Sequence, residues 1–149
     1  MTDSSPIRFS APFQVAWRDL DANNHMANIS YFSFAAQARS LFFAEHGFGP
    51  EAFEAAGIGP ATLEETMRYH REMKFLEKFT VDFLVAGING KNSRYIITNR
   101  LRGEDGELRA ELRTHFVWMD LASRRAIPAP EPLAALMDRL EKTEDFEEL

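Results

Sequence analysis

The residue types best suited to chemistry lie in one short polar stretch, Asp19-Leu-Asp-Ala-Asn-Asn-His25, just before a long apolar segment. If that segment is a helix, its first backbone N–H groups lack partners within the helix, and the dipole there is positive. Such a helix start can stabilise an oxyanion that develops on a carbonyl group. The carboxylate of Asp21, a few residues earlier, is placed to attack the carbonyl carbon or to activate water.

Plainer structural roles fit the same residues. Asp21 also suits a carboxylate that caps a turn or a helix, and His25 suits a partly buried histidine bonded to backbone. Asn23 and Asn28 are of the type that caps turns and helices, and Asn28, at the start of the apolar segment, is a good N-cap. Asp19 is expected to be structural. The residues alone therefore leave both interpretations open.

The apolar segment, residues 29–46, contains no proline and is apolar or small on nearly every side. It ends at Gly47, a residue type suited to the left-handed position that follows many helices. As a helix it would be about 27 Å long at 1.5 Å per residue, enough to run the length of a small sheet. A helix that is apolar all round has to be surrounded, and we expect a curved sheet to surround it.

Alternating apolar residues predict the strands of that sheet. In residues 8–17, Phe9, Phe13, Val15 and Trp17 are expected to share one buried face. Four more strands are expected over residues 61–75, 79–85, 95–101 and 108–118. Turns are expected at residues 90–92 and 103–106, the second with an Asp-Gly hairpin signal. Consecutive strands should therefore pair antiparallel through hairpins.

The whole pattern predicts an α+β domain, an antiparallel sheet wrapped around one long central helix, over residues 1–149. A short helix is expected within residues 50–59 and a terminal helix over residues 132–142. The acidic tail from about residue 141 is expected to be frayed or solvated.

Composition excludes several classes of function. The chain has 17 basic and 23 acidic residues and a net charge of −6, the wrong sign for binding nucleic acid through phosphates. It has no cysteine, which excludes disulfides, thiolate metal sites and a cysteine nucleophile, and its four histidines are too scattered for a zinc motif. No secretory signal or membrane-spanning run is visible. We expect a cytoplasmic protein without a metal, a nucleic-acid partner or a membrane partner.

The residues from Val15 to Asn28, VAWRDLDANNHMAN, followed by Tyr31 and Arg39, resemble a segment of hotdog-fold thioesterases of the 4-hydroxybenzoyl-CoA thioesterase type. Residues 19–28 also resemble plant acyl-ACP thioesterases. The later strands, residues 69–72 (YHRE) and residues 125–130 (RAIPAP) fit the same family, so the likeness covers nearly the whole chain. It implies a hotdog fold and hydrolysis of an acyl-CoA or acyl carrier protein thioester. It also implies a homodimer at minimum, with a homotetramer left open, and no cofactor beyond the coenzyme A of the substrate.

Roles for individual residues come from the resemblance. Asp21 matches the family's catalytic carboxylate, described as a nucleophile in some branches and as a general base in others. Asn23 and His25 match the asparagine and histidine that act beside it in the plant enzymes, and Glu72 matches a glutamate of those enzymes. Asn28 matches the position whose backbone N–H polarises the thioester carbonyl. We therefore expect Asp21, Asn23, His25 and Glu72 to be catalytic and Asn28 to bind substrate.

Some positions depart from the family pattern or fit it only in part. Asn24 stands where many members have glycine, a mild change because asparagine tolerates left-handed backbone, and Ala27 stands where many have asparagine. Lys91 and Arg94 keep part of a basic cluster and are expected to bind coenzyme A phosphates, unless they only line a solvated hairpin. Glu72 also suits a surface ion pair with neighbouring cations.

Two other functions stay open: a hotdog hydratase or dehydratase acting on acyl-CoA, and a non-catalytic acyl-CoA-binding hotdog protein. Four helix aromatics, Phe32, Phe34, Phe42 and Phe43, are assigned to core and dimer packing rather than to an acyl pocket.

Overall fold

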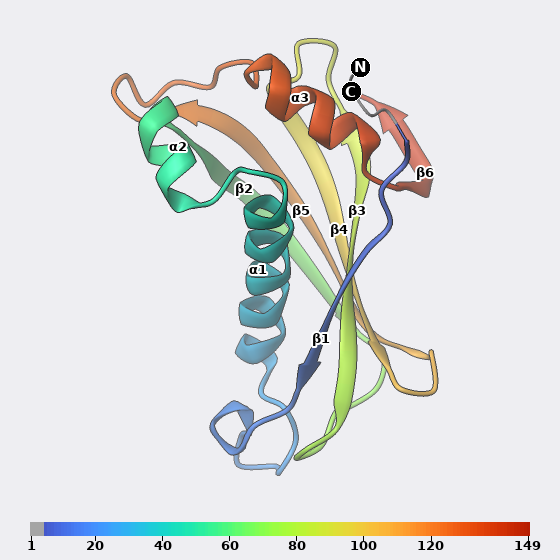
Figure 1. Cartoon of the computed structure of the whole chain (residues 1–149). Helices are drawn as coiled ribbons and strands as arrows, with labels where there is room; N and C mark the ends of the chain where they lie inside the picture. The colour runs from blue at the N-terminus through green and yellow to red at the C-terminus, as the bar shows by residue number, and fades with distance from the viewer. Residues whose placement is uncertain (1–4) are drawn as a thin grey trace.

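A curved sheet and one long helix make up most of the molecule (Figure 1). The structure is a computed structural model and describes residues 5–149. Its elements in chain order are β1 (Phe9–Gln14), a 3-10 helix η1 (Trp17–Asp19), α1 (Asn28–Glu45), α2 (Pro50–Ala56), β2 (Ile58–Tyr69), β3 (Lys78–Ile88), β4 (Arg94–Gly103), β5 (Leu108–Asp120), α3 (Glu131–Arg139) and β6 (Lys142–Glu148). Within these residues the strand order is β1-β3-β4-β5-β2, and β6 pairs with β3.

The position of β2 corrects the expected strand pairing. Strands β3, β4 and β5 pair antiparallel with their sequence neighbours, as the two turns predicted. β2 pairs antiparallel with β5 rather than with β3, which follows it in the sequence. The chain therefore crosses from one side of the sheet to the other after Tyr69. Among the described residues, β2 is paired along only one of its two edges.

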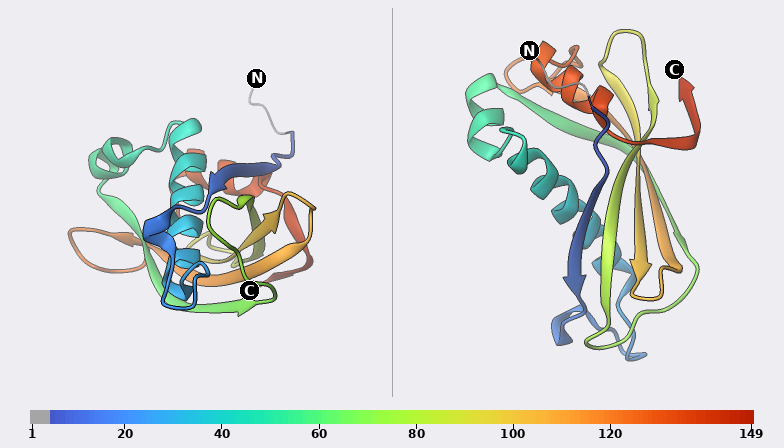
Figure 2. Two further views of the ribbon diagram at one scale, coloured as in Figure 1. Left: turned by 90° about the horizontal axis from the view of Figure 1, so that it is seen from below. Right: turned by 45° about the vertical axis from the view of Figure 1, so that its right-hand side comes forward.

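Helix α1 lies against the curved sheet (Figure 2) and contacts β1, β3, β4 and β5. Its buried side chains are Tyr31, Phe34, Ala35, Ala38, Phe42 and Phe43. The other side of the helix is open, with Ile29 71% and Leu41 44% exposed. The prediction that the helix is surrounded is therefore wrong for this chain, because one sheet covers only one side of it. The helix is followed by Gly47, whose φ of +85° favours glycine.

Two aromatic-rich cores fill the space between helix and sheet. The core near α3 includes Phe42 and Trp118, and the other includes Val15, Met26 and Phe79. The expectation that Trp17 shares the buried face of β1 is wrong, because β1 ends at Gln14 and the chain turns into η1. Trp17 is 78% exposed.

The acidic tail is ordered strand, not frayed chain, which corrects the prediction from its charge. Strand β6 pairs in parallel with β3, with Val85 opposite Lys142 and Ile88 opposite Glu148. The acidic side chains meet arginines of the sheet: Glu144 Oε2 lies 2.8 Å from Arg100 Nη2. This hydrogen bond lowers the pKa of Glu144 to about 2. Opposite charges on β4 therefore hold a segment that looks like solvated tail in the sequence.

Candidate active site

The loop before α1 is a tight turn closed by its own backbone. Leu20 and Met26 form an antiparallel bridge, and the Asp21 N–H donates to the His25 carbonyl at 2.9 Å. Asn24 has a φ of +61°, so it occupies the left-handed conformation that asparagine tolerates better than most residues. This fits the expectation that asparagine can replace the family's glycine here.

Asp19 ties this loop to the start of the helix. Its Oδ2 accepts from the Ala16 N–H at 2.7 Å. Its backbone carbonyl accepts from the Ala27 N–H at 2.8 Å and from the Ser30 hydroxyl at 3.1 Å. Because these contacts use both its side chain and its backbone, Asp19 has the structural role that the sequence indicated.

The Asp21 carboxylate is held by one oxygen only. Oδ1 accepts from the Asn23 N–H at 2.8 Å and from the His25 N–H at 3.4 Å. Within residues 5–149 no hydrogen bond or ion pair to Oδ2 occurs, and the residue is exposed. The carboxylate is thus oriented by the turn while one oxygen stays available for chemistry.

Asn28 is the first residue of α1 rather than its N-cap. The N-cap is Ala27, with φ −64° and ψ 145°, and no side chain caps the helix. The expected capping role of the Asn28 side chain is therefore wrong. In the described part of the chain the Asn28 N–H has no backbone acceptor, as expected for the first turn of a helix. Tyr69 fixes the same residue by donating from its hydroxyl to the Asn28 carbonyl at 3.2 Å.

His25 and Glu72 meet across the loop. His25 Nε2 lies 3.0 Å from Glu72 Oε2, and the neighbouring Met26 N–H donates to the Met73 carbonyl at 2.7 Å. This backbone contact brings the segment after β2 beside the loop, at the lower end of Figure 1. Glu72 pairs with His25 rather than with the cations next to it in sequence, and Arg71 instead pairs with Glu107.

Four of the expected site residues line one open cleft of about 290 Å³, namely Asp21, His25, Asn28 and Glu72. Asn23 does not line it and contributes a backbone N–H to Asp21 instead. The carboxylate, the histidine–glutamate pair and the free helix N-terminus are therefore gathered at one place.

Lys91 and Arg94 lie at the other end of the sheet. Arg94 is opposite Val117 of β5, and Val117 is opposite Ala61 of β2. Tyr69, which contacts Asn28, is eight residues beyond Ala61 along β2, or roughly 26 Å at 3.3 Å per residue. The two cations are thus distant from Asp21 within one chain.

Two tyrosines of the cleft were not singled out by the sequence as site residues. Tyr31 and Tyr69 pack edge to face with ring centroids 5.0 Å apart. Burial raises the pKa of Tyr31 above its ordinary value, so this phenol stays neutral and can serve only as a hydrogen-bonding group near neutral pH. The signal for Tyr69 was its place three residues before Glu72 in the sequence.

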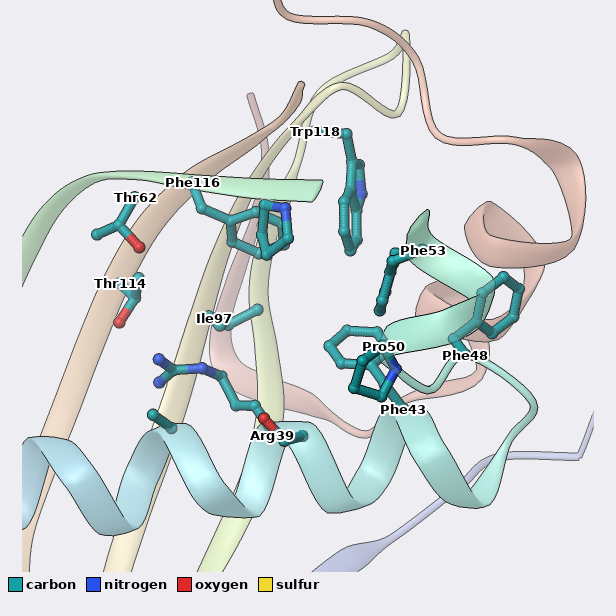
Figure 3. A pocket seen from close by; sticks show the side chains of 13 residues that line it. Arg39, Phe43, Phe48, Pro50, Phe53, Thr62, Ile97, Thr114, Phe116 and Trp118 are labelled. Carbon is teal, nitrogen blue, oxygen red and sulfur yellow. The ribbon is translucent and has the colours of Figure 1, made fainter. Parts of the chain in front are cut away.

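A separate cavity of about 350 Å³ lies between α1, α2 and the sheet (Figure 3). Its walls include Phe43, Phe53, Phe116 and Trp118, together with the guanidinium-bearing Arg39. The assignment of Phe43 to packing alone is corrected by this position, because its ring both packs in the core and lines a cavity.

Neither a metal-binding cluster nor a membrane-spanning helix is present within residues 5–149. In that range no group of three or more histidine, aspartate or glutamate side chains could hold a metal ion. No helix in the described chain is long and apolar enough to cross a membrane.

Residues 15–137 match the sequence profile of the thioesterase-like superfamily. The chain belongs to the thioesterase-like superfamily. A protein of Agrobacterium fabrum named L-carnitine dehydrogenase/betainyl-CoA thioesterase is 25% identical to this chain over 126 residues, which cover 85% of this chain and 25% of that protein. The chain thus spans about a quarter of that relative's length. The predicted thioesterase family is confirmed.

Solved structures extend the likeness from sequence to fold. A Staphylococcus aureus protein solved in complex with CoA has a TM-score of 0.84 at 22% identity, covering 96% of this chain and 91% of that one. The 1,4-dihydroxy-2-naphthoyl-CoA thioesterase of Synechocystis has a TM-score of 0.78 at 15% identity, covering 87% of this chain and 95% of that one. The predicted α+β hotdog fold is confirmed.

Proposed function

We propose that this thioesterase-superfamily chain hydrolyses the thioester of an acyl-CoA at the cleft before α1. The observation that carries the proposal is the convergence of Asp21, His25, Glu72 and the free N–H of Asn28 on one cleft. The relatives named for betainyl-CoA and dihydroxynaphthoyl-CoA, and the neighbour solved with CoA, favour coenzyme A over a carrier protein as the thiol carrier.

The chemistry follows from the geometry of the Asp21 carboxylate. Oδ2 either attacks the thioester carbonyl carbon or takes a proton from a water molecule that attacks it. In both routes negative charge develops on the carbonyl oxygen, and the Asn28 N–H at the positive end of the helix dipole stabilises it. The C–S bond then breaks and coenzyme A leaves as a thiolate. In the second route this thiolate regains the proton that Asp21 took from water, and in the first it takes a proton from solvent. Hydrolysis of the acyl-aspartate completes the first route.

The pair of His25 and Glu72 orients this chemistry. A carboxylate 3.0 Å from Nε2 favours the imidazole form that carries a proton there and fixes the ring. The other ring nitrogen, Nδ1, can then accept a hydrogen bond from a water molecule at the cleft, while Arg71, which also lines it, offers a cation to the polar part of the substrate.

A second copy of the chain would complete the coenzyme A site. If its β2 paired antiparallel along the free edge of this β2, strand directions would reverse across the contact. The Arg94 end of that copy would then approach the Tyr69 end of this one. In this homodimer, Lys91 and Arg94 of one chain would serve the phosphates of coenzyme A bound at the cleft of the other.

The test is thiol release from a panel of acyl-CoA and acyl carrier protein substrates. We expect the unsubstituted chain to turn over at least one of these substrates. Asp21→Asn should lose at least about 100-fold in kcat, because an amide neither attacks nor takes a proton at neutral pH. The control variant Asp138→Asn, which removes an exposed carboxylate on α3, should turn over normally. Full activity of a folded Asp21→Asn variant would refute the role of Asp21. Acyl-CoA binding without thiol release would identify a non-catalytic binding protein instead.

A further inference from the structure

The cavity between α1, α2 and the sheet contains one charged side chain, Arg39, among the described residues that line it. Arg39 lies at the end nearer Thr62 and Thr114, and the rings of Phe53 and Trp118 lie at the other end (Figure 3). A guanidinium at one end of an apolar chamber is an arrangement suited to a ligand with an anionic head and an apolar body.

Among the described residues, the hydrogen bonds of Arg39 leave most of its donors free. Nη1 donates to Asn99 Oδ1 at 2.8 Å, whereas a guanidinium carries five N–H donors. Within residues 5–149 no ion pair joins Arg39 to a carboxylate. Glu65 contributes an opposite charge that raises the pKa of Arg39, but its Oε2 already accepts a hydrogen bond from the Thr114 hydroxyl at 2.8 Å. The remaining donors of Arg39 are therefore open to an occupant of the cavity.

The environment makes a partner for this cation energetically favourable. Burial lowers the pKa of Arg39, and Glu65 offsets part of that effect. A poorly hydrated cation gains most from a carboxylate, because a guanidinium binds one with two parallel hydrogen bonds. At about 350 Å³ the cavity is at the small end of ligand pockets, so the apolar body has to be compact.

The aromatic end of the cavity supplies a surface for that body. Phe53 stacks on Trp118 with ring centroids 5.8 Å apart and an interplanar angle of 22°. Phe43 meets Trp118 edge to face at 5.9 Å. Rings in these arrangements favour a flat aromatic or short aliphatic group beside them.

We propose that this cavity binds a free carboxylic acid with a compact apolar body, the carboxylate on Arg39 and the body among Phe43, Phe53 and Trp118. The assignment of this acid as a reaction product rests on the proposed function, because thioester hydrolysis releases an acid of that class. A neutral thioester lacks the charge that Arg39 recognises. The site therefore distinguishes released acid from unreacted substrate.

The acid site is separate from the reacting carbonyl of the same chain. Arg39 follows Asn28 by eleven residues along α1, which corresponds to about 16 Å at 1.5 Å per residue. A compact acid on Arg39 thus leaves the Asn28 N–H free. Binding at the cavity can consequently be measured without any thioester and independently of hydrolysis.

The experiment compares an acid with its uncharged amide. The chain has two tryptophans, and Trp17 is exposed whereas Trp118 is buried and lines the cavity. In a Trp17→Phe background, Trp118 emission is titrated with phenylacetate and with phenylacetamide, and with hexanoate and hexanamide. We expect the acids to bind roughly 10- to 100-fold more tightly than their amides, as a charge-assisted hydrogen-bonded pair implies.

Two variants assign the effect to this cavity. Arg39→Met keeps the apolar stem and should abolish the preference for acid over amide. Ala36→Phe, at a lining position on the open side of α1, should weaken both ligands while leaving Arg39 intact, and it serves where Arg39→Met does not fold. Asp21→Asn should bind the acids normally, so a failure of the proposed hydrolysis is distinguished from a failure of this site.

Equal affinity for acid and amide, or no response of Trp118 to either, would overturn the proposal. So would an acid preference that persists in folded Arg39→Met, or affinities for acid and amide that Ala36→Phe leaves unchanged. In each of these cases Arg39 is only a structural link from α1 to Asn99 of β4.

Discussion

Replacing Asn28 by proline tests the helix start with little disturbance of the fold. Asn28 is the first residue of α1, the helical position at which proline is most readily accepted because its missing N–H has no partner in the helix. The residue before proline has to be extended, and Ala27 already has φ −64° and ψ 145°. The bond from Tyr69 goes to the Asn28 carbonyl, which proline keeps.

The expected loss of activity follows from the number of donors removed. Deleting one oxyanion donor typically costs about 100- to 1000-fold in kcat. The cleft is open to solvent in this chain, where Asp21 is exposed, and water weakens electrostatic stabilisation. We therefore expect the lower value, about 100-fold in kcat or ~2.7 kcal/mol in activation free energy.

The assay measures kcat by thiol release for Asn28→Pro against Asn28→Ala, which removes the side chain but keeps the N–H. Urea unfolding of both variants provides the stability control, and we expect them to differ by less than about 1 kcal/mol. If both fold and Asn28→Pro retains a kcat within about threefold of Asn28→Ala, well inside the typical effect, the carbonyl oxygen is not held by this N–H.

Three further substitutions probe the loop, the histidine pair and the tail. Asn24→Gly should preserve activity. Asn24→Val should lower the free energy of unfolding by roughly 1–2 kcal/mol in a denaturant titration, because a β-branched residue is strained at φ +61°. Equal stability of the two variants would contradict the left-handed turn. Glu72→Gln should lower kcat/KM by about 10-fold because it releases His25. The free energy of unfolding should change by less than about 0.5 kcal/mol, since the pair of His25 and Glu72 is partly exposed. A large loss of stability with unchanged kcat/KM would show that the pair is structural. The carboxyl of Glu144 has a pKa lowered to about 2 by Arg100, so its contribution to tail attachment is present above its ordinary pKa and is lost as pH falls toward 2. Amide exchange of β6 should therefore rise over that acidic range, and Glu144→Gln should raise it already at pH 7; slow exchange in both cases would assign the tail to backbone pairing alone.

Local structure was largely readable from the sequence. The apolar run with Gly47 after it predicted α1, and alternation predicted the strands that became β3, β4 and β5, because these signals depend on residues close together in the chain. The loop was found for the same reason: Asp21, His25 and Asn28 lie within eight residues of one another. Family resemblance then added Glu72.

The arrangement of the site depended on contacts that a linear pattern does not contain. Glu72 lies beside His25 because a backbone hydrogen bond from Met26 to Met73 joins two segments that are far apart in the sequence. The residues next to Glu72 in the sequence did not indicate whether it pairs with His25 or with Arg71. The same limit applies to Tyr69, whose hydroxyl reaches Asn28 from another element.

The sequence by itself determined the long helix, the strands up to β5 and the carboxylate that stands before the helix start, since propensity, periodicity and turn chemistry act over a few residues. Only the tertiary structure decided that β2 joins β5, that the acidic tail becomes β6, and that Arg39 faces an aromatic cavity where residues 5–149 leave most of its donors without a partner. Each of these outcomes is a choice of partner among distant segments. Which segments pair depends on the apolar surface they bury together and on their opposite charges, and these contacts form between side chains that are far apart in the sequence.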